Sequence, residues 1–415
     1  MKFHSSLNGK RVEQRLSMLA EIGKTPEDGV QRIALTGEDR EAQELVSSWM
    51  READMTVAND QFGNLIGRKA GSDSKAPSVM IGSHIDTVPN GGRFDGTIGV
   101  IGGVEVVQAI HEAGIPHRHT IEVVAFCDEE GARFQSGLFG SRAIVGNIRP
   151  QELQRTDQNG VSRYTALRSF GLNPDDIVRS IRKAGDLKVY LEMHIEQGPY
   201  LQSIGEPVGI VTGIAAPTWL RIKLIGEAGH AGTVPMHLRR DPMCGAAEAI
   251  SAIEKLCAGD GTKPTVGTVG KIMVKPGGVN VIPSTVEFTA DIRDIELSRR
   301  VKVVSQIIGV VNEISARRGL QNEVEEILHS TPMHCASHVI ETMETYSRKI
   351  GLTPPKMISG AGHDAMMLAE ITDIGMIFVR CRDGISHSPK EWASIEDIMK
   401  GTELLFETTL AYARQ

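Results

Sequence analysis

Short runs of apolar, mostly β-branched residues recur in the first half of the chain, and each run stops at a polar cluster. Three of them, Val79–Gly82, Ile121–Phe126 and Val189–Met193, lead into the sequences SHIDT, CDEE and HIEQG. Runs of this length predict buried strands. The segment GTIGVIGGVEVVQAIHEAG between the first two predicts a helix that ends at Gly114. Strand, helix and strand form a βαβ unit, which predicts a largely parallel sheet.

The pattern changes between residues 213 and 329. Predicted helices at Pro242–Cys257 and Val301–Arg318 alternate there with predicted strands in the order β-α-β-β-α-β, which is the ferredoxin-like split unit. The α/β pattern then resumes. We therefore expect a mixed, largely parallel α/β domain with helices on both faces, formed by 1–212 and 330–415, and an inserted ferredoxin-like domain at 213–329.

Histidines and acids gather where the predicted strands end, and open α/β sheets place their functional sites there. Asp95 alone would be interpreted as a helix N-cap, and a lone histidine as structural. Five candidate ligands in separate segments are harder to dismiss, and three imidazoles with two carboxylates suit two ions of zinc, manganese or cobalt. The predicted ligands are His84, Asp95, Glu130, His194 and His387.

Two further acids are expected to support the metal ligands. Asp86 lies two residues after His84, and residues i and i+2 of a strand share a face, so we expect the Asp86 carboxylate to accept the second ring N–H of His84. Glu129 and Glu130 are adjacent acids after a buried strand, which is costly unless a cation compensates them. We predict Glu130 as a ligand and Glu129 as the general base that takes a proton from water.

Composition and charge exclude several classes of function. The formal net charge of −7 disfavours a nucleic-acid partner, which needs concentrated Lys and Arg. The five cysteines contain no CxxC pair, which excludes zinc-finger and disulfide-framework interpretations. No apolar run approaches the ~20 residues of a membrane span, and the N-terminal residues lack a signal-peptide pattern. We expect a cytoplasmic protein without membrane partners.

Seven motifs resemble a known family in their order and spacing. They are GSHIDT, GRFDG, DEEGARF, HIEQG, HAGT, SGAGHDA and ISHSP. They resemble the amidohydrolase branch of the aminoacylase/carboxypeptidase-type dinuclear metallohydrolases, which includes N-carbamoyl-L-amino-acid hydrolases, allantoate amidohydrolases and β-ureidopropionases. The resemblance implies one ion on His84, Asp95 and His194. It implies a second ion on Asp95, Glu130 and His387.

The same resemblance implies roles outside the metal ligands. It implies a homodimer made through the inserted domain, which acts as a lid. His230 would polarise the scissile carbonyl, and Asn280 and Arg293 would hold the substrate carboxylate. Arg commonly binds carboxylates through two parallel hydrogen bonds, which agrees with this role. Gln197 and the Gly360–Gly362 loop would supply further substrate contacts.

These features predict a metal-dependent hydrolase that cleaves a ureido C–N bond of a small carboxylate. We expect an N-carbamoyl-L-amino acid as substrate, with a free amino acid, ammonia and carbon dioxide as products. Allantoate, giving ureidoglycine or ureidoglycolate, is the alternative. Two further alternatives are a dipeptidase or aminoacylase and a catalytically inactive binding protein on the same fold.

Overall fold

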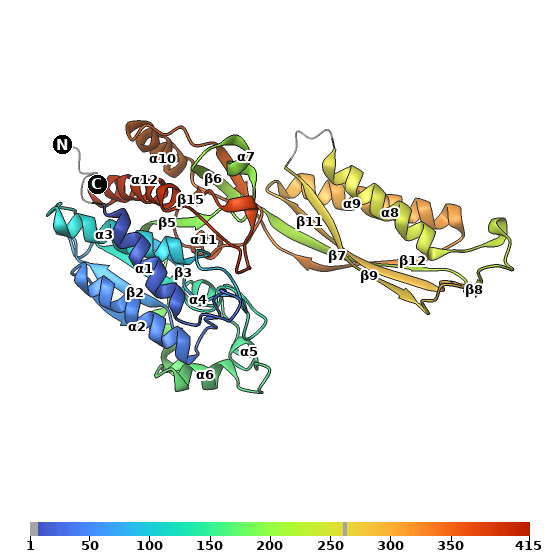
Figure 1. Ribbon diagram of the computed structural model, residues 1–415, viewed down its shortest axis with the longest axis horizontal. Coiled ribbons are helices and arrows are strands. Elements are labelled where there is room, and N and C mark those ends of the chain that lie inside the picture. Colours follow the sequence, from blue (N-terminus) through green and yellow to red (C-terminus); the bar gives the residue numbers. More distant parts are fainter. Residues whose placement is uncertain (1–6, 260–263) are drawn as a thin grey trace. The chain divides into compact units, whose positions relative to one another are not determined.

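The computed structural model describes residues 7–259 and 264–415, and the chain forms two compact units (Figure 1). The first unit comprises Met1–Thr212, Cys335–Met357 and His363–Gln415. The second comprises Gly213–His334 and Ile358–Gly362. The first unit therefore contains three separate stretches of the chain, and most of the second lies between two of them.

The first unit is built on a mixed sheet whose centre is parallel. Its strands follow the order β1-β2-β4-β3-β5-β15-β6. The pairs β4/β3, β3/β5 and β5/β15 are parallel, whereas the outer pairs β1/β2, β2/β4 and β15/β6 are antiparallel. The strand bounds are β1 Thr56–Asn59, β2 Leu65–Lys69, β3 Ser78–His84, β4 Ile121–Phe126, β5 Leu187–Ile195, β6 Val208–Ile214 and β15 Ile374–Val379. The prediction of a mixed, largely parallel sheet is confirmed.

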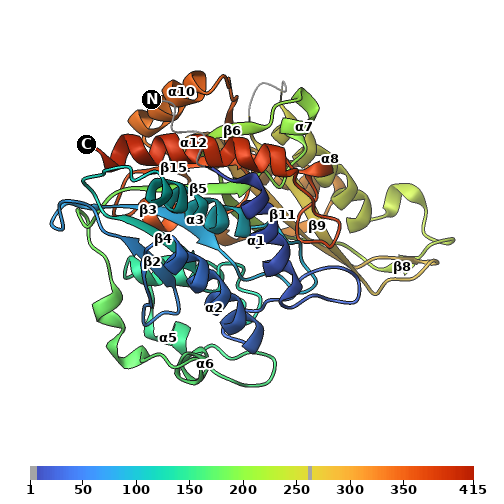
Figure 2. The same cartoon turned by 60° about the vertical axis from the view of Figure 1, so that its left-hand side comes forward.

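Helices cover both faces of this sheet (Figure 2). Met193 of β5 packs against Gly102 of α3 (Thr97–Glu112) and Gly401 of α12 (Ile395–Ala413). The neighbouring Glu192 accepts a hydrogen bond from the backbone N–H of Ala365, the first residue of α11 (Ala365–Leu368). Consecutive strand residues point to opposite faces, so α3 and α12 lie on one face and α11 on the other.

The remaining helices of the first unit are mostly short and lie around this sheet. Their bounds are α1 Gly9–Glu21, α2 Gly37–Glu52, α4 Phe139–Ile144, α5 Pro150–Leu153, α6 Arg163–Ser169, α7 Tyr200–Ile204 and α10 Ser337–Lys349. Asn8, Thr36 and Ser394 cap α1, α2 and α12 with their side chains. No helix of the described residues is long and apolar enough to cross a membrane.

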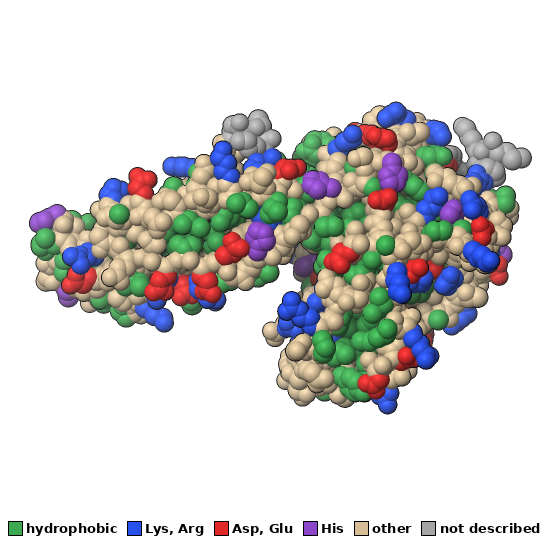
Figure 3. Space-filling model, turned by 180° about the vertical axis from the view of Figure 1, so that it is seen from behind, with side chains coloured by type: hydrophobic (Ala, Val, Ile, Leu, Met, Phe, Trp, Pro, Cys, Tyr) green, Lys and Arg blue, Asp and Glu red, His purple; other side chains and the backbone are tan. Residues whose placement is uncertain are grey.

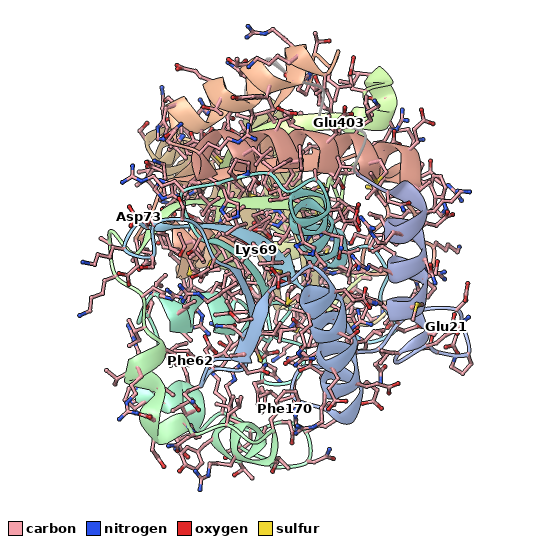
Figure 4. All side chains as sticks on the ribbon, turned by 90° about the vertical axis from the view of Figure 1, so that its left-hand side faces the viewer. Glu21, Phe62, Lys69, Asp73, Phe170 and Glu403 are labelled. Carbon is pink, nitrogen blue, oxygen red and sulfur yellow. The ribbon has the colours of Figure 1, made fainter. Side chains whose placement is uncertain are left out.

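A separate hydrophobic cluster supports the segment that follows β4. It includes Phe62, Phe139 and Phe170, and Figure 4 labels Phe62 and Phe170 on this side of the unit. The Phe62 and Phe139 rings meet edge to face with centroids 6.3 Å apart. The buried guanidinium of Arg163 lies 4.1 Å from the centroid of the Phe139 ring and donates to the Asp128 carboxylate at 2.7 Å. This packing holds the chain just before Glu129.

The second unit is an antiparallel sheet with two helices packed on one face. The strand order is β12-β7-β11-β9. Its elements are β7 Ala216–Ile225, α8 Pro242–Ala258, β9 Val266–Lys275, β11 Thr285–Asp294, α9 Leu297–Arg318 and β12 Gln321–His329. Residues of β7 alternate between the buried Leu220 and Ile222 and the exposed Trp219 and Arg221. The exposed face is polar in part, because Arg221 pairs with Glu325 on the neighbouring strand at 2.7 Å.

The bounds of this unit differ from the expected 213–329. The short strand β13 (Met333–His334) pairs with the end of β6, and β14 (Lys356–Ser359) leads into Gly360. The Ser359 carbonyl accepts a hydrogen bond from Ala215, and the Gly360 carbonyl accepts one from Arg293. These bonds place Ile358–Gly362 in the second unit, although we expected this segment in the α/β domain. A two-stranded ribbon of β8 (Gly229–His230) and β10 (Val281–Ile282) was also not predicted.

Candidate active site

Five side chains of the first unit converge where the parallel strands end. They belong to the end of β3, the loop before α3, the loop after β4, the end of β5 and the loop after β15. Their ligand atoms form two groups, and within each group all atoms lie within 4.8 Å of one another. The first group is His84, Asp95 and His194, and the second is Asp95, Glu130 and His387. Asp95 belongs to both.

The separations between these atoms suit divalent ions. Asp95 Oδ1 lies 3.5 Å from His84 Nε2 and 3.0 Å from His194 Nε2. Asp95 Oδ2 lies 3.4 Å from His387 Nε2, which is 3.5 Å from Glu130 Oε2. Ligands ~2.1 Å from a tetrahedral ion lie ~3.4 Å from one another. The two carboxylate oxygens thus face two different groups, as a bridging carboxylate requires, and the residues fit a dinuclear site.

The histidine tautomers also favour metal binding. His84 Nδ1 lies 2.9 Å from the backbone carbonyl of Asp86, and His194 Nδ1 lies 2.9 Å from that of Ile195. A carbonyl can only accept, so both Nδ1 atoms carry protons and both Nε2 atoms can present lone pairs. The Gly96 N–H points at His194 Nε2 at 3.1 Å, which agrees with this assignment.

Asp86 supports the site differently from what we predicted. Its backbone carbonyl accepts from His84, whereas its carboxylate lies 3.8 Å from the ring, beyond hydrogen-bond distance. The carboxylate instead accepts the N–H groups of Glu129 and Glu130, both at 3.2 Å. The prediction for the carboxylate was wrong because β3 ends at His84, so the alternation of strand residues no longer applies at Asp86. Asp86 therefore holds the backbone of the two adjacent acids.

Glu129 and Glu130 point to different partners, as adjacent residues should. Glu129 Oε2 lies 3.6 Å from His84 Nε2, and Glu130 contacts His387. Burial and the nearby carboxylates raise the pKa of Glu129 well above its usual range, and burial and Asp95 raise that of Glu130 to about 7. A buried group of acids is costly without a compensating cation. The site is therefore arranged for positive charge.

One glycine is required by the geometry of the first group. Gly96 follows Asp95 and has a φ of +63°. A Cβ atom at this position would fall on the His84 ring. The backbone can approach the imidazole closely only because residue 96 has no side chain.

Three polar side chains contact the Asp95 segment. Gln197 Nε2 donates to Asp95 Oδ2 at 2.8 Å, and the Ser386 hydroxyl donates to the same oxygen at 2.6 Å. Glu391 accepts the backbone N–H of Asp95 at 3.0 Å. Gln197 was predicted as a substrate contact, whereas Ser386 and Glu391 were not predicted. The only sequence signal for them is their position around His387 in ISHSPKEW.

The second unit carries the other predicted substrate residues in two places. His230 and Asn280 lie together, because β8 pairs with β10 and the Ala231 N–H donates to the Asn280 carbonyl at 3.0 Å. Arg293 lies near the end of β11, paired with Asp291 at 2.8 Å, and donates to the Gly360 carbonyl at 2.7 Å. Gly362 is exposed and ends the same segment as Gly360.

Comparison with known proteins adds to this geometry. Residues 80–411 match the family model described as peptidase family M20/M25/M40. The chain belongs to this family. Among M20 relatives, an N-carbamoyl-L-amino-acid amidohydrolase from Pseudomonas sp. (strain NS671) is 56% identical over 98% of this chain and 99% of its own length. Allantoate deiminase 1 from Glycine max is 35% identical over 93% of this chain and 86% of its own length.

A solved structure supports the same assignment as these sequence relatives. The amidase of the hydantoinase/carbamoylase family from Burkholderia multivorans superposes with a TM-score of 0.93 at 34% identity, covering 99% of this chain and 98% of that one. The resemblance inferred from the seven motifs is confirmed at the level of the family and of the amidohydrolase branch.

Metal binding should compete with protons at His387. The hydrogen bond to Asp95 raises the pKa of His387 to about 9, although burial opposes this. Below about pH 9 an ion on Nε2 must displace a proton, so metal affinity should rise with pH, about tenfold per pH unit for each proton released, and level off above that pKa. Calorimetric titration of the chelator-stripped protein in buffers of different ionisation enthalpy measures the protons released. An affinity independent of pH below 9, with no proton release, would contradict this assignment.

Proposed function

We propose that the chain is a dinuclear metal-dependent amidohydrolase that converts an N-carbamoyl-L-amino acid to the free amino acid, ammonia and carbon dioxide. The observation that carries the proposal is the pair of ligand groups sharing Asp95, with Glu129 beside them. The 56% identity to a relative named for this activity favours the carbamoyl substrate. We propose His84, Asp95, Glu130, His194 and His387 as the ligands of two ions, zinc, manganese or cobalt.

Two bound ions would acidify a water molecule and polarise the ureido carbonyl. Glu129 is placed to take a proton from that water, since its carboxylate borders the first ligand group without being part of it. The same carboxyl then returns the proton to the leaving nitrogen as the C–N bond breaks. The amino acid departs, and the remaining carbamic acid decomposes to ammonia and carbon dioxide. Asp86 assists by holding the backbone of Glu129.

The ureido group of the substrate finds a complementary side chain in Gln197. Its Oε1 atom is buried and has no hydrogen-bond partner among the described residues, while its Nε2 is held by Asp95. An unpaired buried carbonyl oxygen is costly and seeks a donor. We propose that the ureido NH₂ group supplies it. Arg293, with Asn280, the Gly360 backbone and Gly362, would hold the carboxylate, and His230 would polarise the scissile carbonyl.

These residues of the second unit cannot all reach one small substrate from a single chain. The ribbon of β8 and β10, which carries His230 and Asn280, continues the pairing of β7 with β11 beyond Thr285. At this end of β11 the Gly226 N–H donates to the Ser284 carbonyl. Arg293 lies eight residues further along the strand. At ~3.4 Å per residue this separation is about 27 Å, far more than the side chains can span. We infer that His230 and Asn280 serve the site of a second copy, in a homodimer formed through this unit, which acts as a ferredoxin-like lid.

The open face of the second unit's sheet offers an apolar surface for such a dimer. Trp219, Val266 and Ile327 are 41%, 54% and 37% exposed, and they line a cavity of about 550 Å³ with Arg293. Figure 3 shows hydrophobic side chains between charged ones on this unit. Exposed apolar patches commonly mark protein interfaces.

The five cysteines are unpaired, which supports our proposal of a cytoplasmic protein.

Substrate turnover tests this proposal directly. We expect ammonia release from N-carbamoyl-L-amino acids to exceed release from allantoate by at least about tenfold in kcat/KM. Both compounds carry one carboxylate, but allantoate has a second ureido group in place of the amino-acid side chain, and a pocket that accepts an apolar side chain leaves this group without hydrogen-bond partners. A coupled ammonia assay with both substrates measures this ratio. Higher turnover of allantoate would favour the activity named in the Glycine max relative. Cleavage of unmodified dipeptides alone would favour a peptidase. No turnover of any of these compounds would favour a binding protein.

Replacing the proposed base tests the mechanism. Glu129→Gln keeps the size of the side chain but removes its basicity, so we expect kcat to fall by about 10²–10⁴-fold while two ions remain bound. Metal content by elemental analysis and turnover at saturating substrate are measured on the same sample. A near-normal rate with full metal content would show that Glu129 is not the base.

Mixing two inactive variants tests the shared site. His230→Ala and Glu129→Gln subunits should each be inactive as homodimers. If His230 serves the partner's site, a mixed dimer contains one site with both residues intact, and roughly half of the wild-type rate per mixed dimer should return. Refolded or co-expressed mixtures, separated by two affinity tags, provide these dimers. No recovery in verified mixed dimers would show that His230 acts within its own chain.

A further inference from the structure

The Glu391 carboxylate is a fixed support for the Asp95 segment. It is 3% exposed, and its Oε1 atom accepts the backbone N–H groups of both Phe94 and Asp95, at 2.8 and 3.0 Å. Its Oε2 atom lies 3.0 Å from the Ser386 hydroxyl, which is 2.6 Å from Asp95 Oδ2. Glu391 thus supports Asp95 in two ways. It accepts the backbone N–H of Asp95 directly, and it contacts Ser386, whose hydroxyl donates to the Asp95 carboxylate.

This contact joins two segments that are distant in the sequence. Asp95 and Glu391 are 296 residues apart, and the loop between Ser386 and Glu391 carries His387. His387 and Asp95 are members of the second ligand group. The Glu391 side chain therefore fixes the position of Asp95 relative to the loop that carries His387. Neither Asp95 nor His387 lies inside a strand or helix, so the loops need such a constraint.

A glycine makes room for this carboxylate. A Cβ atom at residue 92 would fall on the carboxylate group of Glu391. The backbone of the NGGRFDG loop passes so close to Glu391 only because Gly92 has no side chain. Close packing on one side, and two backbone N–H donors together with the Ser386 contact on the other, leave the carboxylate little freedom. An acid that only filled space would not need both backbone hydrogen bonds and the close packing against Gly92.

We propose that Glu391 is a positioning residue for the dinuclear centre, which orients Asp95 to bridge both ions and holds the His387 loop against it. The proposal rests on the metal site of the proposed function, and it extends that function by assigning a residue outside the ligands and the base. Groups that orient metal ligands typically change metal affinity or activity by 10–100-fold when removed. Glu391 acts through Asp95, Phe94 and Ser386 and need not touch the substrate.

The test is metal affinity, measured with zinc in competition with a chromophoric chelator. Glu391→Ala should bind the ions about 10–100-fold more weakly. Glu391→Gln should stay within a fewfold of wild type, because its amide oxygen can accept the same two N–H bonds and its NH₂ group can donate to Ser386. Gly92→Ala should weaken binding in the same direction without altering Glu391 itself, so the test does not depend on one variant folding.

A matched control separates positioning from stability. Glu105 is also fully buried and accepts a backbone N–H, from Asn8 at 2.7 Å. Its ion-pair partners are Arg11 at 2.7 Å and Arg15 at 3.9 Å, and neither its N–H donor nor these partners is a proposed metal ligand. Glu105→Ala should lower the thermal unfolding temperature of the metal-free protein and leave zinc affinity unchanged. The proposal is overturned if Glu391→Ala binds zinc as wild type does, if Glu391→Gln loses as much as Glu391→Ala, or if Glu105→Ala weakens zinc binding equally. None of these outcomes depends on which substrate the enzyme hydrolyses.

Discussion

The geometry of the candidate site depends on one buried carboxylate, Asp95, which belongs to both groups of ligand atoms. Asp95 has one oxygen facing His84 and His194 and the other facing His387. Burial opposes the charge of this carboxylate, but the surrounding imidazoles hold its pKa well below the usual range. An ionised Asp95 among further acids is stable only with positive charge nearby. The two divalent ions that we propose would meet this requirement and would supply Lewis acidity at the same time.

The fold satisfies this constraint through the parallel order of its central strands. Strands β3, β4 and β5 run in the same direction, so their carboxyl ends meet at one edge of the sheet. His84, Glu130 and His194 are brought together there although long segments separate them in the sequence. The loops before α3 and after β15 add Asp95 and His387. Most of the proposed substrate contacts lie on the second unit, whereas Gln197 lies beside Asp95 in the first.

Much of the site could be predicted because its signals are local. An apolar run that stops at a histidine or an acid identifies a strand end, and parallel order brings such ends together. The role of the Asp86 carboxylate was mispredicted because the direction of the chain after His84 cannot be inferred from strand alternation. Glu391 was missed because its partners are backbone N–H groups 296 and 297 residues away. Such a contact leaves no periodicity or spacing in the sequence.

The central claim is that Asp95 bridges two ions. Anomalous diffraction from crystals of the protein loaded with zinc or manganese tests it most directly, because the signal locates each ion independently of any assay. We predict two anomalous peaks about 3.5–4 Å apart, one contacted by His84 and His194, the other by Glu130 and His387, with one oxygen of Asp95 on each. A single ion at full occupancy, or two ions of which only one contacts Asp95, would contradict the account.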